Sequence, residues 1–115
     1  MIMAKPIYMV SGSKGGVGKS TVSMALVHYL TARSEELLLI EADTANPDVG
    51  KSYSKMVETV NVNLDEKEGW MDMANRLSEQ PDATVVINTP ARSGEGVKLY
   101  LYGLPRRDAY RGNGR

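Results

Sequence analysis

Residues 7–21 read IYMVSGSKGGVGKST, and this stretch joins a strand signal to a helix signal through a glycine-rich turn. The apolar run Ile7–Val10 does not alternate with polar residues, which is typical of a strand buried on both faces of a parallel sheet. Residues 19–32 then follow a helical spacing with one apolar face. That face is predicted to consist of Val22, Ala25, Leu26, Tyr29 and Leu30. Strand, glycine-rich turn and helix together form the context that a phosphate-binding loop requires.

The rest of the chain continues this alternation of strands and helices. Buried strands are predicted at 37–40 and 83–87, a half-exposed edge strand at 59–64, and helices at 51–57 and 69–79. The last helix has an apolar stripe that comprises Trp70, Met73, Ala74 and Leu77. The alternation predicts an α/β fold, here a three-layer, Rossmann-like P-loop fold with a mostly parallel sheet. Such sheets bind ligands at the carboxyl ends of their strands, where this chain has its polar segments 11–21, 41–48 and 88–94.

The glycine-rich turn carries the residue types that bind phosphate. Glycines let backbone N–H groups converge on phosphate oxygens, and the start of a helix adds a partial positive charge. Lys19 is predicted to contact the β- and γ-phosphates, Ser20 to bind Mg²⁺, and Thr21 to reach the α-phosphate. The predicted binding residues are Ser13, Lys14, Gly15, Gly16, Val17, Gly18, Lys19, Ser20 and Thr21. The alternative is a purely structural turn before a helix.

The stretch KGGVGKST at 14–21 resembles the deviant Walker A loop of the ParA/MinD family of P-loop ATPases. The strict Walker A pattern asks for glycine at position 13, where this chain has Ser13. The resemblance implies ATP as the nucleotide and catalytic roles for Lys14 and Lys19. It also implies a homodimer that encloses ATP as a sandwich, in which Lys14 reaches the phosphates of the partner.

A second strand end extends the resemblance. Residues 39–43 are similar to the strand that leads to an Asp-x-Asp switch in that family. Asp43 matches the second aspartate, which implies a catalytic role in orienting water near the metal, whereas Glu41 replaces the first. The alternative for Asp43 is a solvated residue at a strand end.

A third strand end, at 85–91, is similar to the Walker B strand of the family. That strand should end in aspartate, and here it ends in Asn88. An amide offers Mg²⁺ and its waters only a neutral oxygen, and charge-assisted hydrogen bonds are stronger than neutral ones. We therefore expect Asn88 to permit binding and to slow hydrolysis. The implied Mg²⁺ ligands are Ser20, Asp43 and Asn88.

Within the family, residues 5–98 most resemble the TraL-like proteins of plasmid conjugal transfer. The segments that carry this resemblance are EADTANPD at 41–48 and NTPA at 88–91. This resemblance implies an ATP-binding accessory of DNA transfer with a protein partner in the transfer complex. Three functions remain open: an ATPase switch between monomer and dimer, a nucleotide-binding module that hydrolyses poorly or not at all, and a P-loop kinase for a small molecule. Asn88 favours the second, and the string KGGV disfavours the kinase.

The resemblance ends near Lys98. Residues 1–98 are therefore predicted to form a partial P-loop nucleotide-binding domain, the N-terminal half of the fold, and 99–115 an irregular basic tail. The abrupt change in charge and pattern at Leu99 predicts a truncated or frame-shifted product. In that case the first strand would have an unpaired apolar edge.

Composition and charge argue against several classes of protein. The chain has no cysteine, which excludes disulfides, iron–sulfur clusters and thiolate zinc sites within it. Lys and Arg number 14, as do Asp and Glu, but four of the arginines lie within 99–115. Residues 1–98 are therefore net acidic, and direct nucleic-acid contact is not expected there. With no apolar run long enough for a signal peptide or a membrane span, we expect a cytoplasmic protein without membrane contact.

Overall fold

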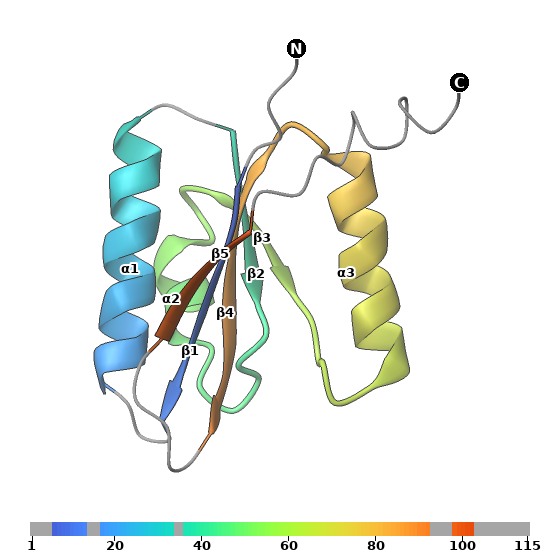
Figure 1. Cartoon of the computed structure of the whole chain (residues 1–115), viewed down its shortest axis with the longest axis horizontal. Helices are drawn as coiled ribbons and strands as arrows, with labels where there is room; N and C mark the ends of the chain where they lie inside the picture. Colours follow the sequence, from blue (N-terminus) through green and yellow to red (C-terminus); the bar gives the residue numbers. More distant parts are fainter. Residues whose placement is uncertain (1–5, 14–16, 34–35, 93–97, 103–115) are drawn as a thin grey trace.

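The computed structural model describes residues 6–13, 17–33, 36–92 and 98–102. Strands and helices alternate along most of the chain (Figure 1). Their bounds are Ile7–Ser13 for β1, Val17–Ala32 for α1, Leu37–Glu41 for β2, Asp48–Tyr53 for α2, Glu58–Asn61 for β3, Lys67–Glu79 for α3, Thr84–Arg92 for β4 and Lys98–Tyr102 for β5. Among these described residues, no helix is long and apolar enough to cross a membrane.

The strands form one sheet in the spatial order β3-β2-β4-β1-β5. The first four strands pair in parallel, and β5 pairs with β1 in the antiparallel direction. Figure 1 shows α1 and α2 on one face of the sheet and α3 on the other, which makes three layers. The predicted α/β fold with a mostly parallel sheet is therefore confirmed.

β2 is buried along its whole length because it lies between two strands and between two layers of helix. Successive side chains of a strand point to opposite faces of the sheet. Ile40 belongs to the apolar cluster that includes Met73 of α3, whereas Leu39 belongs to the cluster that includes Val27 of α1. An unbroken apolar run is thus what the position of β2 requires.

The buried face of α1 differs from the predicted one. The structure buries Ser23, Val27 and Leu30, whereas Tyr29 of the predicted face is 57% exposed. The buried face extends back to Lys19, one helical turn before Ser23, because the first turns of α1 lie over polar groups at the strand ends. The prediction was right for Leu30 but wrong for Ala25 and Tyr29, because it followed apolar residues alone and this face begins with two polar ones.

Residues 98–102 overturn two expectations about the end of the chain. They form β5, although an irregular tail was predicted from residue 99 onward. β5 pairs with β1 from Ile7 opposite Tyr102 to Ser11 opposite Lys98, so β1 has a neighbour on both sides instead of an unpaired edge. The cause is the backbone of β1, whose open row of hydrogen-bonding groups can pair with a segment that lacks a strand pattern. Residues 103–115 of the predicted tail lie outside the described residues.

β4 continues beyond its apolar run and carries the pairing past Pro90. The β1–β4 register shifts between Val10 and Gly12, and the Thr89 hydroxyl donates to the Val10 carbonyl oxygen at 2.8 Å. Pro90 has no backbone N–H, so a regular ladder could not pass through it. The shift lets the two strands pair as far as Ser13, which brings the end of β4 beside the beginning of the glycine-rich turn.

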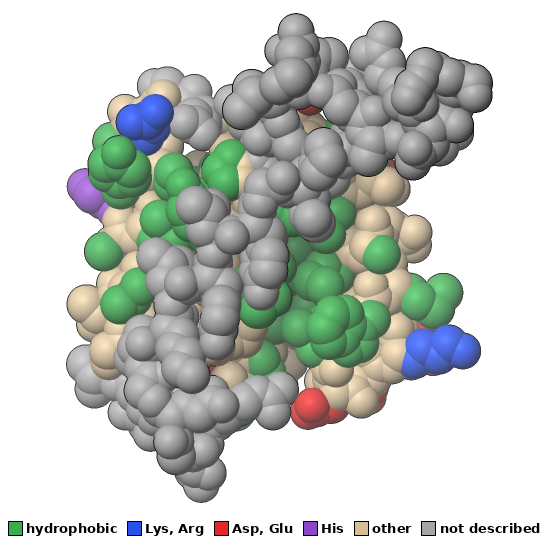
Figure 2. All heavy atoms as spheres, viewed as in Figure 1, with side chains coloured by type: hydrophobic (Ala, Val, Ile, Leu, Met, Phe, Trp, Pro, Cys, Tyr) green, Lys and Arg blue, Asp and Glu red, His purple; other side chains and the backbone are tan. Residues whose placement is uncertain are grey.

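α3 keeps part of its predicted apolar stripe on the surface. Of this stripe, Met73 is buried and Leu77 is partly buried, but Ala74 is exposed and Trp70 is 52% exposed. Met71, which lies outside the stripe, is 54% exposed. Figure 2 shows apolar side chains gathered on the surface beside α3. The indole N–H of Trp70 donates to the carbonyl oxygen of Leu64 at 2.7 Å. This bond holds the ring at the start of the helix and away from the core.

Candidate nucleotide-binding site

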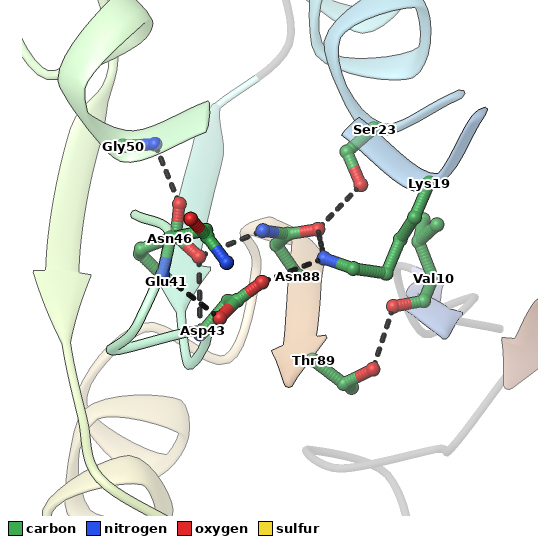
Figure 3. A network of polar contacts seen from close by, with 9 residues as sticks. All are labelled: Val10, Lys19, Ser23, Glu41, Asp43, Asn46, Gly50, Asn88 and Thr89. Carbon is green, nitrogen blue, oxygen red and sulfur yellow. Dashed lines mark hydrogen bonds and ion pairs between the residues drawn. The ribbon is translucent and has the colours of Figure 1, made fainter. Parts of the chain in front are cut away.

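The ends of three parallel strands and the start of α1 meet at one edge of the sheet. β1 ends at Ser13 and α1 begins at Val17, so Lys19 lies in the first turn of the helix. Its side chain is buried, and its Nζ donates to Asp43 Oδ2 and to Asn88 Oδ1, both at 3.1 Å (Figure 3). Residues from three separate segments therefore converge on one ammonium group.

Asn88 is the centre of this polar network and is fully buried. Its Oδ1 also accepts a hydrogen bond from Ser23 Oγ at 2.8 Å, and its Nδ2 donates to Glu41 Oε2 at 2.7 Å. An ammonium group only donates and a carboxylate only accepts, so the amide satisfies both neighbours in one orientation alone. The amide oxygen therefore faces α1, and the amide nitrogen faces β2.

Glu41 links the strand ends to the first turn of α2. Its Oε1 accepts a hydrogen bond from the backbone N–H of Gly50 at 2.7 Å, and its Oε2 accepts one from the backbone N–H of Asp43 at 3.1 Å. With the bond from Asn88, the buried carboxylate has three donors. A carboxylate is also favoured electrostatically near the N-terminus of a helix. These contacts offset the cost of burying its charge.

Asp43 is 3% exposed, and its two carboxylate oxygens have different partners. Oδ2 accepts from Lys19, and Oδ1 accepts from the backbone N–H of Asn46 at 3.1 Å. A solvated residue at a strand end would have neither this burial nor a buried ion pair. The alternative interpretation of Asp43 is therefore wrong for this structure.

The network holds one buried cation, Lys19, and two buried anions, Asp43 and Glu41. Removing one partner of a buried ion pair is strongly destabilising because it leaves a charge without compensation in a poorly solvated place. Lys19 is thus both a group that can bind phosphate and the cation that offsets the two carboxylates. Any ligand that attracts its ammonium competes with Asp43 and Asn88 for it.

The structure describes the other predicted site residues unevenly. Lys14, Gly15 and Gly16 lie outside the described residues, and for Ser13 and Val17 the structure describes the backbone, at the end of β1 and the start of α1. The neighbours of Lys19 in α1 are partly buried or exposed: Gly18, Ser20 and Thr21. Of the predicted catalytic and metal-binding residues, Asp43 and Asn88 both accept hydrogen bonds from Lys19.

Sequence reasoning missed three residues that bond to the predicted ones: Ser23, Asn46 and Gly50. Ser23 lies one helical turn after Lys19, so the two share a face of α1, and this spacing was a usable signal. Gly50 is recognised only from the packing of α2 against Glu41. Nothing in its local sequence points to that contact.

The polar groups of these residues fit a nucleoside triphosphate with Mg²⁺. Lysine is a point charge that suits phosphate, and carboxylate, amide and hydroxyl oxygens are hard ligands that suit Mg²⁺. Within the part of the chain that the structure describes, no three His, Cys, Asp or Glu residues gather as a metal site. Mg²⁺ in nucleotide sites commonly uses one or two protein oxygens together with phosphates and water, which matches this sparse set.

Comparisons with known proteins agree with the geometry. A family model for ParA, described as an NUBPL iron-transfer P-loop NTPase, matches residues 3–93. Protein MobD of Acidithiobacillus ferrooxidans is 55% identical over 98 residues, which are 85% of this chain and 43% of that protein. The chain thus spans less than half the length of this relative. No solved structure matches the chain.

Proposed function

The chain belongs to the ParA family of P-loop NTPases, and on this premise we propose that it binds ATP together with Mg²⁺ at the start of α1. The observation that carries the proposal concerns Lys19, which lies in the first turn of α1. Its ammonium is buried and donates hydrogen bonds to Asp43 and Asn88. Helix N-termini that follow a glycine-rich loop bind phosphate through backbone N–H groups and the helix dipole. A lysine at this position adds a full positive charge.

The roles of the site residues follow from their chemistry. The backbone of 13–21 and the ammonium of Lys19 would hold the phosphates. Ser20, Asp43 and Asn88 supply the oxygens that would hold Mg²⁺, and the bound ion supplies positive charge beside the phosphate oxygens. Bound phosphate oxygens would compete with Asp43 for the ammonium of Lys19, and Asp43 would then be free to accept a hydrogen bond from another donor.

Titration of ATP with Mg²⁺ against the wild type and Lys19→Met tests this proposal. We expect the wild type to bind a fluorescent ATP analogue and Lys19→Met to lose at least about tenfold in affinity, since a charged hydrogen bond contributes about 1.5–3 kcal/mol. Lys67→Met is the matched control, because Lys67 is exposed at the start of α3. Equal affinity of Lys19→Met and the wild type, with both proteins folded, would overturn the proposal.

We further propose that ATP binding serves a nucleotide-dependent switch in plasmid conjugal transfer. The similarity of residues 41–48 and 88–91 to TraL-like proteins supports this role, as does the identity with Protein MobD. In this proposal two copies enclose ATP, Lys14 reaches the phosphates of the other copy, and the dimer binds a protein partner of the transfer complex. Sedimentation with and without ATP tests the dimer, and Lys14→Ala should abolish any ATP-dependent increase in mass. An ATP-dependent dimer that Lys14→Ala leaves unchanged would contradict the sandwich.

A module that binds ATP without turning it over is the second candidate, and Asn88 favours it. The amide of Asn88 carries no charge, and both of its polar groups already have partners in the network. A steady-state assay of phosphate release separates the two candidates. Multiple turnovers of the purified wild type, absent in Lys19→Met, would establish the ATPase, and binding without turnover would establish the module.

A further inference from the structure

Glu41 and Asn88 are matched to each other across two neighbouring strands. They are direct register partners of β2 and β4, and the Asn88 amide donates to Glu41 Oε2 at 2.7 Å. Register partners of neighbouring strands carry their side chains on the same face of the sheet, and here both side chains are fully buried. The buried carboxylate on β2 therefore takes one of its three donors from β4, and the amide of Asn88 is that donor.

This pairing decides which way the Asn88 amide points. Its nitrogen is held by Glu41, so its oxygen must face Lys19 and Ser23, on the side of the candidate nucleotide site. If the amide turned over, its N–H groups would face the ammonium and its oxygen would face the carboxylate. Both contacts would then be repulsive.

The same carboxylate also holds α2. Gly50 donates its backbone N–H to Glu41 Oε1, and a Cβ added at Gly50 would lie 3.1 Å from both Cβ and Cγ of Glu41. α2 thus approaches Glu41 as closely as a residue without a side chain permits. A continuous row of hydrogen bonds runs from the lysine of α1 through Asn88 and Glu41 to α2 (Figure 3).

We propose that Glu41 is a positioning residue of the nucleotide site, which aims the Asn88 oxygen at the bound ligand and couples ligand binding to α2. This inference rests on the proposed ATP binding. In this account Glu41 and Asn88 form a matched pair, with the carboxylate on β2 and the amide on β4. Asn88 is therefore more than a position at which β4 has lost a carboxylate. Replacing Asn88 alone by aspartate would set two acceptors against each other and remove the donor to Glu41.

A double-mutant cycle tests the proposal with the variants Glu41→Gln, Asn88→Asp and E41Q/N88D. Asn88→Asp sets two carboxylates against each other, and Glu41→Gln leaves a single acceptor oxygen for the separate donors of Gly50 and Asn88. The double substitution restores one donor and one acceptor between the two strands, with their places exchanged. We expect each single variant to bind Mg-ATP about tenfold more weakly than the wild type, and the double variant to lie within about threefold, since residues in direct contact couple by 0.5–3 kcal/mol. Full recovery is not expected, because the N–H of Asp43 loses its acceptor in the double variant.

The dependence of ATP affinity on Mg²⁺ concentration provides a readout that a purely structural role would not move. The double variant places its carboxylate on β4 beside Lys19, so it should reach half-maximal ATP binding at a lower Mg²⁺ concentration than the wild type. Glu68→Gln, an exposed change in α3, is the control for the negative charge that Glu41→Gln removes; the double variant keeps the net charge of the wild type. Circular dichroism at the assay temperature identifies the variants that are folded.

The outcomes separate this inference from the proposed function. Failure of the wild type to bind ATP would overturn both. Binding by the wild type, with the two single losses adding up in the double variant, would overturn the role of Glu41 and leave ATP binding intact. If a single variant does not fold but the double variant does, this rescue supports the pairing of Glu41 with Asn88. An unchanged Mg²⁺ dependence of ATP binding in the double variant would overturn the positioning role of Glu41.

Discussion

The ammonium of Lys19 and the carboxylate of Asp43 form a buried ion pair with a separation of 3.1 Å, although one residue lies in a helix and the other follows a strand. Both side chains are almost wholly removed from solvent. The pair means that the lysine is already extended over the carboxyl ends of the strands. Lys19 therefore contributes to the stability of the protein as well as to its proposed function.

Lys19→Met should lower the free energy of unfolding by about 3–5 kcal/mol, because it leaves Asp43 and Glu41 buried without their cation. Urea unfolding followed by circular dichroism measures the loss. Adding Asp43→Asn to Lys19→Met should recover part of it, since one of the uncompensated charges is then gone. A double variant as unstable as the sum of its single variants would contradict this account of the ion pair.

Ser23→Ala should lower the free energy of unfolding by about 1 kcal/mol, the contribution of a typical hydrogen bond. The change removes the hydroxyl that donates to Asn88 Oδ1 at 2.8 Å, while Lys19 continues to donate to the same oxygen. Ser52→Ala, at an exposed position of α2, is the matched control and should stay within about 0.5 kcal/mol of the wild type. Equal effects of the two substitutions would show that the Ser23 bond contributes nothing.

Gly50→Ala should destabilise the protein, although alanine is usually favoured over glycine within a helix by roughly 0.5–1 kcal/mol. The new methyl group would lie 3.1 Å from Glu41, whose carboxylate is fixed by three hydrogen bonds and has little room to move. We expect a loss of about 1–3 kcal/mol, as is usual for overpacking. A rise in the melting temperature would show that Glu41 yields easily and is not a rigid link between the site and α2.

Gly69→Ala should be among the most damaging changes outside the site. A Cβ at this position would overlap the carbonyl oxygen of Asn63, so the start of α3 and the preceding loop would have to separate. We expect a loss of about 3 kcal/mol and a shift in the fluorescence of the adjacent Trp70, whose indole is bonded to Leu64 in that loop. Glu68→Ala is the control, since Glu68 is exposed and also lies in the first turn of α3. An unchanged emission spectrum of Gly69→Ala would contradict the predicted separation.

The strands and helices next to the site could be predicted because each has a local pattern. Apolar runs without alternation correctly indicated β1, β2 and β4, and helical spacing indicated α1 and α3. Parallel strands have their carboxyl ends at one edge, so Lys19, Asp43 and Asn88 could be expected to be neighbours from distant places in the chain. In the structure Lys19 donates hydrogen bonds to both Asp43 and Asn88.

The errors have a common origin in contacts between distant segments. The buried face of α1 was misassigned because Lys19 and Ser23 are buried by polar partners on the strands, which apolar periodicity does not register. β5 was missed because its formation depends on the free edge of β1 and not on a pattern within 98–102.

Residue types and their order were therefore enough to identify a phosphate-binding loop and the sheet that carries it. They were not enough to assign a partner to Glu41, because that partner depends on the strand register that sets Glu41 opposite Asn88 and on the close approach of Gly50. Backbone preference and apolar spacing act over a few neighbouring residues and can be read along the chain. Buried hydrogen bonds join groups that only the packed fold brings within 3 Å of each other. The tertiary structure alone therefore decided which groups of this site are hydrogen-bonded to each other.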